Sequence, residues 1–312
     1  MIRLVLTRVL STVPVLAVVA LVVFGMLRLS GDPAAILAGD TASPEQIEQV
    51  RIALGLDRPP HEQFLVWMGQ ILRLDLGRSL YTGLPVTTLI AQRLEPTAML
   101  ALTTITFSVL VAVPLGVLAA WRAGSWIDRA VMVFAVVGFS VPVFVVGYVL
   151  IFTFSLSLRW LPVQGYVSPF VDPGRFAAQI VLPTLTLSCI YVALLARITR
   201  ASVIEVLGED YIRTARAKGQ IERTVLFRHA LKNAAVPVVT VIGLGVALLI
   251  GGVVVTESVF NIPGLGRLVV DAITRRDYPI IQGLILFFAV IYVVLNLLID
   301  IAYTLLDPRI RY

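Results

Sequence analysis

The sequence predicts an all-α integral membrane protein, on the strength of its composition and of the way its apolar residues are distributed. Of its 312 residues, 58% are hydrophobic and only 14% are charged, whereas soluble domains average about 45–50% apolar and about 25% charged residues. The apolar residues are gathered in long runs with few charges, as in helices that face lipid. The net charge of +6 does not indicate nucleic-acid binding, because the basic residues fall between these runs, where orientation in a bilayer accounts for them.

Six segments reach the roughly 17–25 residues that a transmembrane helix needs. They are residues 9–27, 99–121, 130–158, 179–196, 234–256 and 280–304. The third is long enough to tilt or to run past the bilayer. The first also has the basic start of a signal peptide, but its apolar run is longer than a usual signal and no A-x-A cleavage pattern follows. We therefore expect it to be retained as a span.

The distribution of Arg and Lys predicts which side each loop faces, since cytoplasmic loops are enriched in both. With a cytoplasmic N-terminus, more than half of the 25 basic residues fall on the inner side, many of them in the loop 197–233. In the long segment 30–95, acidic residues outnumber basic ones, which fits the outer side. We therefore expect residues 1–29 to hold a cytoplasmic N-terminus and the first span, and residues 305–312 to form a cytoplasmic tail.

The outer segment 30–95 contains two helical patterns. In "ASPEQIEQVRIALGLDRPP", Ser43 is a candidate N-cap, Pro44 takes the first helical position and Gly55 ends the helix. The stretch "EQFLVWMGQILRLDLG" then places apolar residues at helical spacing. They are Phe64, Trp67, Met68, Ile71 and Leu72. Such a stripe lies on the membrane surface or packs on neighbouring helices, and we favour packing within a small extracytoplasmic cap.

A basic stretch, "EDYIRTARAKGQIERTVLFRHALKNAAVP", interrupts the apolar sequence at residues 209–237. Its pattern predicts a short helix that ends at Gly219 and a second helix that begins at about Ile221. An ordinary cytoplasmic loop, whose charges orient the protein and touch lipid headgroups, would also be basic. Composition alone does not separate this reading from a binding role.

The order of residues in the stretch resembles the cytoplasmic coupling motif of ABC importer permeases. Arg213, Thr214 and Ala215 stand where that motif has E-A-A, and Gly219 matches its glycine, while Lys232 replaces its proline and the nearest proline is Pro237. A narrower resemblance, to the dipeptide, oligopeptide and nickel branch, covers nearly the whole chain. It rests on "ASPEQIEQVRIALGLDRP", "DLGRSLYTGLPV", "GSWIDR", "WLPVQGYVSP", "LARITRASVIEVLGEDYIRTARAKG", "RHALKNAAVPVVT", "FNIPGLGRL", "DAITRRDYPIIQG" and "LDPRIRY".

The resemblance implies a type I ABC importer permease fold, with six transmembrane helices and an extracytoplasmic helical segment after the first. Residues 96–304 would form the permease core in a bacterial inner membrane. The implied partners are a second homologous permease, two ABC ATPase subunits, an extracytoplasmic solute-binding protein and a peptide substrate. ATP and Mg²⁺ would bind to the ATPases, leaving no cofactor in this chain. The residues implied to couple it to an ATPase are Tyr211, Arg213, Ala215, Ala217, Lys218 and Gly219.

The stretch "FNIPGLGRLVVDAITRRDYP", between the fifth and sixth expected spans, is rich in turn residues and too short and polar to cross the membrane. We expect either a re-entrant or cap helix at the outer mouth, with a role in gating or in receiving solute, or a structured loop. The residues we select as candidates for the pathway or the gate are Glu257, Asn261, Pro263, Gly264 and Asn296.

Other function classes find little support in the sequence. The chain has only two lysines, Lys218 and Lys232, and neither is followed by the Ser or Thr of a P-loop. The two histidines are expected on opposite sides of the membrane and the single cysteine within a span, so we predict no catalytic or metal site. The alternatives that stay open are a self-sufficient secondary transporter or channel and, within the family, a permease for nickel, glutathione or another small solute.

Overall fold

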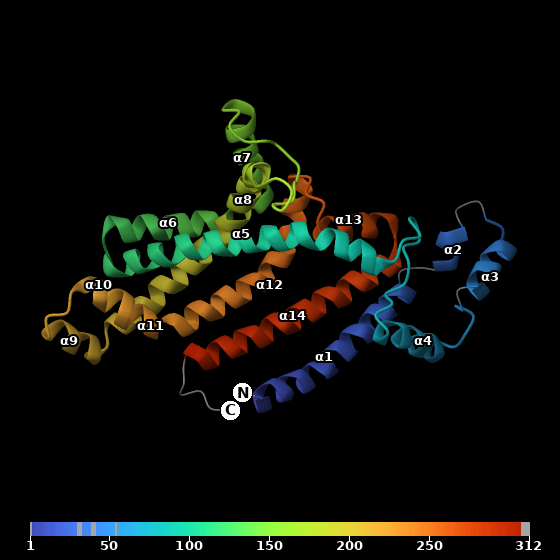
Figure 1. Cartoon of the computed structure of the whole chain (residues 1–312), viewed down its shortest axis with the longest axis horizontal. Coiled ribbons are helices and arrows are strands. Elements are labelled where there is room, and N and C mark those ends of the chain that lie inside the picture. The colour runs from blue at the N-terminus through green and yellow to red at the C-terminus, as the bar shows by residue number, and fades with distance from the viewer. Residues whose placement is uncertain (1, 30–32, 39–41, 54, 307–312) are drawn as a thin grey trace. The chain divides into compact units, whose positions relative to one another are not determined.

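The structure is a computed structural model that describes residues 2–29, 33–38, 42–53 and 55–306. The described chain is helical apart from its turns and an isolated β-bridge between Arg78 and Pro85. Its helices before the second expected span are α1 (Ile2–Leu29), α2 (Pro33–Ala38), α3 (Pro44–Ala53) and α4 (Pro60–Leu72). The later ones, all drawn in Figure 1, are α5 (Val86–Trp121), α6 (Trp126–Ser140), α7 (Val143–Leu150), η1 (Ile151–Ser157), α8 (Pro173–Leu207), α9 (Asp210–Ala217), α10 (Glu222–Thr224), η2 (Val225–Ala230), α11 (Leu231–Asn233), α12 (Ala235–Val259), α13 (Leu265–Arg275) and α14 (Tyr278–Leu306).

The helices pack into two compact units. The first unit comprises residues 1–94 and 268–294, and the second comprises residues 95–267 and 295–312. The residues of α5, α13 and α14 are each divided between the two units. All the candidate functional residues selected above lie in the second unit.

Within the described residues, three helices are long and apolar enough to cross a membrane: α5, α8 and α14 up to Ile301. Two bent pairs, α6 with α7–η1 and the α10–α11 stretch with the start of α12, bring the number to five if each counts as one span. In α1, the described apolar stretch is the shorter Leu10–Met26. An all-α membrane architecture is confirmed by these helices, and the count of six spans stays a prediction.

The third expected span, residues 130–158, differs from a single continuous helix. Its two halves are bent by 104° around the break between Ser140 and Val143. The break has a local cause: Val141 precedes Pro142 and adopts an extended backbone, with φ −86° and ψ 125°. A residue before proline is disfavoured in the helical region, because the proline ring would clash with it. One proline thus divides a uniformly apolar segment that hydropathy alone presents as one helix.

In the first unit, the two expected helices of the outer segment are confirmed. Ser43 Oγ accepts a hydrogen bond from the Gln46 N–H, and the Ser43 N–H donates to Gln46 Oε1 at 2.8 Å, so α3 begins with a reciprocal cap. The carboxylate of Glu45 accepts a hydrogen bond from the Ser43 hydroxyl, which lowers the pKa of Glu45. The apolar stripe of α4 packs on α1. The centroid of the Phe24 ring lies 5.3 Å from that of Phe64 and 5.6 Å from that of Trp67.

In the second unit, α8 is the central helix. Of its most apolar window, 61% is buried, against 33% for α5, so α8 is surrounded by protein for most of its length. Three apolar clusters follow one another along it. The first joins Ile180 and Leu182 to Phe260 and Ile262 beyond α12. The second joins α8 to α5, α6 and α12 around Ala196. The third joins Val203 to the C-terminal end of α5 and to η2.

Candidate functional site

The first group of candidate residues belongs to α9, which follows α8 after two residues, Gly208 and Glu209. α9 has a single fully buried residue, Ile212, whose side chain is 0% exposed. The helix ends as the sequence predicted: Gly219 has φ +76°, and its N–H donates to the carbonyl of Arg216 at 2.9 Å. A left-handed glycine after the last helical turn is the common way to end a helix, since a side chain is strained in that conformation.

The α9 helix is fastened to the helical stretch that follows it. Arg216 and Glu222 form an ion pair across the Gly219 turn, with Nε 2.8 Å from Oε1. The Asn233 side-chain amide donates to the Tyr211 hydroxyl at 2.9 Å. Val225, at the start of η2, is fully buried. These contacts form a helix, a glycine turn and a second helix, which is the arrangement expected from the sequence.

The coupling residues selected from the sequence are mostly exposed. Tyr211, Arg213, Ala217, Lys218 and Gly219 are exposed, and Ala215 is half-buried. No heavy atom within 4 Å would meet a Cβ built on Gly219. Because Ile212 and Ala215 share the covered face of α9, the opposite face of the helix is available to another molecule. Small residues beside a glycine turn would let a second backbone approach closely.

The second group of candidate residues surrounds Glu257, near the end of α12. Its side chain is 0% exposed, which for a carboxylate requires hydrogen-bond partners. The Thr97 hydroxyl, from α5, donates to Oε1 at 2.6 Å, and the Arg267 N–H donates to Oε2 at 2.9 Å. Gly264 is pressed against the same carboxylate, because a Cβ at this position would collide with it. Glu257 is therefore held from three sides.

These contacts also explain how α13 begins. The first N–H groups of a helix have no partner within it. The Leu265 N–H donates to the Thr97 hydroxyl at 2.8 Å, and the Arg267 N–H donates to Glu257. Thr97 and Glu257, from two other helices, thus supply the acceptors that a local N-cap residue would otherwise provide. Of the two alternatives for the stretch between the fifth and sixth expected spans, the structure shows a helix, whose first N–H groups are bound within the second unit.

The other selected residues take different positions. Asn261 is exposed, has φ +53° and accepts a hydrogen bond from the Arg267 guanidinium. Pro263 is exposed beside it, whereas Asn296 is half-buried within α14. The structure thus brings Glu257 and Gly264 into contact and leaves the α9 group at the other end of α8. Roles for these residues in a pathway or a gate stay predictions.

Thr97 is a contact residue that the sequence reasoning missed. It lies 160 residues from Glu257 along the chain, so no local pattern pairs the two. The only signal is a hydroxyl side chain at the beginning of an apolar run, directly after Pro96. Within the described residues, no group of three or more His, Cys, Asp or Glu side chains is placed to hold a metal ion. The α9 group is largely exposed, and the group around Glu257 fixes the local backbone.

Comparison with known proteins gives matches along the chain. The profile of the family described as "Binding-protein-dependent transport system inner membrane component" matches residues 112–312, and that of its N-terminal counterpart matches residues 1–101. A probable peptide ABC transporter permease of Sinorhizobium fredii is 54% identical over 99% of both chains. A putative peptide transport system permease of Brucella abortus is 45% identical over 100% of both chains. The glutathione transport system permease GsiC of Escherichia coli is 43% identical, again over 100% of both.

Proposed function

Because the chain belongs to the family of binding-protein-dependent transport system inner membrane components, an ABC importer permease family, we propose that it carries short peptides into the cell. In this proposal it lines the translocation path together with a second, homologous permease. Two ATPase subunits bind it from the cytoplasm and hydrolyse ATP, and an extracytoplasmic solute-binding protein delivers the peptide. The single observation that carries the coupling part of the proposal is the exposed α9 helix with its glycine turn.

The geometry of α9 supports its role as the ATPase contact. A helix that docks into a groove on a partner must be held in place and must present an exposed face. α9 meets both conditions, since Ile212 anchors it from below and the Arg216–Glu222 pair braces its end. Movement of a docked ATPase would act on α9 and, through the two-residue link, on α8. Tilting of α8 would then open the path to one side of the membrane at a time.

The solute class rests on the names of the relatives. Two are named for peptide transport and one for glutathione, which is itself a short peptide. One chemical class therefore covers all three names. We propose dipeptides or short oligopeptides as the solutes, and we expect the binding protein to select among them. The proposed orientation has both termini in the cytoplasm and the Glu257 region at the outer mouth, because the basic loop 197–233 favours the inner side.

The proposal is tested by reconstituting the permease with its partner subunits and binding protein in proteoliposomes. One set of vesicles encloses ATP with an ATP-regenerating system, and the other set encloses no ATP. We expect uptake of a radiolabelled dipeptide only with ATP and with the binding protein present. Unlabelled glutathione, added as a competitor, reports whether the same path accepts it. Uptake by this chain alone, driven by an ion gradient, would contradict the proposal and support a secondary transporter.

The ATPase contact is tested separately with Gly219→Asn. Asparagine tolerates the left-handed backbone better than other side chains, so the turn should survive while the surface gains bulk. We expect co-purification of the ATPase to fall about tenfold, which corresponds to about 1.4 kcal/mol, while the second permease is retained. Gly83→Asn is the matched control, because Gly83 has φ +68° and open space like Gly219 but lies in the segment 30–95. Equal ATPase recovery in both variants would remove α9 from the proposed interface.

A further inference from the structure

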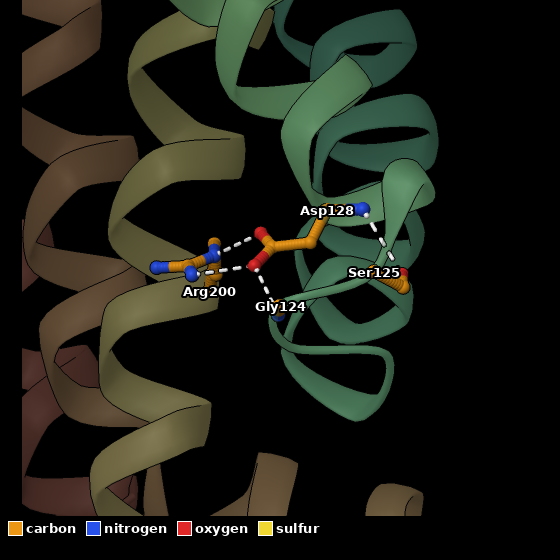
Figure 2. A network of polar contacts seen from close by, with 4 residues as sticks. All are labelled: Gly124, Ser125, Asp128 and Arg200. Atoms are coloured by element: carbon orange, nitrogen blue, oxygen red, sulfur yellow. Dashed lines mark hydrogen bonds and ion pairs between the residues drawn. The ribbon is translucent and has the colours of Figure 1, made fainter.

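An ion pair joins α6 to α8 close to the end of α8 that leads to α9. Figure 2 shows the Arg200 guanidinium facing the Asp128 carboxylate with two parallel hydrogen bonds, from Nε to Oδ1 and from Nη2 to Oδ2, the latter 2.7 Å long. The Gly124 N–H also donates to Oδ2, at 2.9 Å, and the Asp128 N–H donates to Ser125 Oγ. Asp128 is only 4% exposed. The Asp128 carboxylate therefore joins the turn before α6 to the side of α8, while its backbone N–H takes part in the N-cap of α6.

The position of this pair along α8 indicates a role beyond holding two helices together. Arg200 lies one turn before Val203, which packs with Leu226 and Ala230 of η2 and with Val117 of α5. Any displacement of α9 reaches these turns of α8 by two routes. One route is the covalent link through Gly208, and the other is the packing of η2. Among the described residues, the pair is the polar contact from α8 to a neighbouring helix that lies nearest to α9 along α8.

The remaining contacts between α6 and α8 are of a different kind. Gly138 of α6 packs closely on Ala193 and on the carbonyl of Cys189, and apolar side chains such as Val131 and Val192 fill the space between the two helices. Apolar contacts of this type are not directional. A bidentate pair of arginine and carboxylate has a fixed geometry. It sets the register of α6 along α8.

Beyond its bend, α6 leads toward the other group of candidate residues. Gly147 of α7 lies against Val259 and Phe260, at the end of α12. The Phe260 carbonyl accepts a hydrogen bond from the Gly165 N–H at 3.1 Å, which fixes the loop after η1 to the same place. Glu257 lies just before this turn, in the last turn of α12, and Gly264 lies just after it. A shift of α6 along α8 would therefore displace the turn between Glu257 and Gly264, two of the residues selected as candidates for the gate.

We propose that Asp128 and Arg200 are positioning residues for energy coupling, which lock α6 to α8 so that movement of α9 reaches the turn around Glu257. This inference rests on the proposed role of α9. Without the pair, α8 would move while α6 slipped, and ATP hydrolysis would continue with less solute moved. The pair touches neither the solute nor the ATPase in this arrangement. Its contribution is to the ratio between solute transported and ATP hydrolysed.

The test uses Asp128→Asn and Arg200→Lys in the full complex, with dipeptide uptake and ATP hydrolysis measured on the same proteoliposomes. Asparagine keeps the size of the side chain and removes its charge, and lysine keeps the charge but loses the bidentate geometry. We expect uptake per ATP to fall about tenfold in Asp128→Asn and about threefold in Arg200→Lys, within the range by which residues on coupling networks act. Recovery of the ATPase with the permease should equal that of the wild type.

Tyr191→Phe is the matched control for a purely structural effect. The Tyr191 hydroxyl donates to the Ile242 carbonyl at 2.7 Å, so its removal also breaks a polar link between α8 and another helix. In this control, we expect uptake and ATP hydrolysis to fall together with the amount of assembled complex. If Asp128→Asn or Arg200→Lys assembles and keeps the wild-type ratio of uptake to ATP hydrolysis, the inference is overturned. A wild-type preparation that recovers no ATPase would instead overturn the proposed function, so the two failures are distinguishable.

Discussion

One group of candidate residues lies near each end of α8, and the protein holds the two groups in different ways. At the α9 end, one buried side chain, Ile212, anchors a helix whose other positions are largely exposed. At the other end, Glu257 and Gly264 are buried and in mutual contact, and Glu257 is held by hydrogen bonds from α5 and from the start of α13. The first arrangement leaves side chains available to another molecule, and the second uses side chains to fix the backbone. Selection by sequence pattern gave no sign of this difference.

The difference also decides what a substitution would report. At the α9 end, an exposed position can be changed without disturbing the permease, so loss of a partner there is informative. At the Glu257 end, each residue supports the others, and a change alters the local structure before it alters any solute contact. Three variants test this contrast, ordered from the largest expected effect to the smallest.

Ile212→Ala should have the largest effect, because it removes the buried anchor of α9. Truncation of a buried isoleucine costs about 2–5 kcal/mol in other proteins. We expect α9 to lose protection from amide hydrogen exchange while α8 keeps it. Ile221→Ala is the control, since Ile221 is 75% exposed. If α9 stays equally protected in both variants, the helix is held by something other than its single buried residue.

Gly264→Ala should have an intermediate effect at the opposite end of α8. The new methyl group would meet the Glu257 carboxylate, which cannot retreat without giving up its hydrogen bonds to Thr97 and Arg267. Overpacking of this kind costs about 1–3 kcal/mol. A lower melting temperature of the purified permease in detergent is the expected result. Gly69→Ala, in α4 with open space around it, should leave that temperature unchanged or raise it, and equal behaviour of the two variants would contradict the tight packing at Gly264.

Removal of the ion pair between Arg216 and Glu222 should have the smallest effect. Both side chains are about 40% exposed, and solvated pairs contribute below about 1 kcal/mol. A double-mutant cycle with alanine at both positions, followed by thermal unfolding, measures the coupling between them. We expect this small energy to weaken further in high salt. A coupling well above 1 kcal/mol would mean that the end of α9 is more rigid than its exposure indicates.

Much of the local structure was predictable because its causes are local. The cap at Ser43, the glycine turn at Gly219 and the stripe around Phe64 each depend on residues within a few positions of one another. The bend at Pro142 was also within reach, since proline and the residue before it carry the signal, but the apolar run concealed it. A hydropathy pattern indicates how long and how apolar a segment is, but it does not show where the helix axis changes direction.

The contacts that define the candidate sites were harder to predict because they join distant parts of the chain. Glu257 was selected as a candidate for the pathway or the gate, but its partner Thr97 lies on another helix. Arg200 and Asp128 were noted only as parts of loop and family patterns, and their pairing depends on how α6 packs on α8. One sequence without homologues contains no information on such pairs beyond their opposite charges. The exposure of the α9 residues likewise follows from which side of the helix Ile212 occupies.

The bend at Pro142 limits the length of straight helix at this point of the chain. α6 has 15 residues and rises about 22 Å, short of the roughly 30 Å of hydrocarbon in a typical bilayer. Bent by 104° from α6, the α7–η1 piece adds little length along the same axis. A straight segment of this length would match only a hydrocarbon layer thinner than average, and mismatch costs a fraction of a kcal/mol for each ångström.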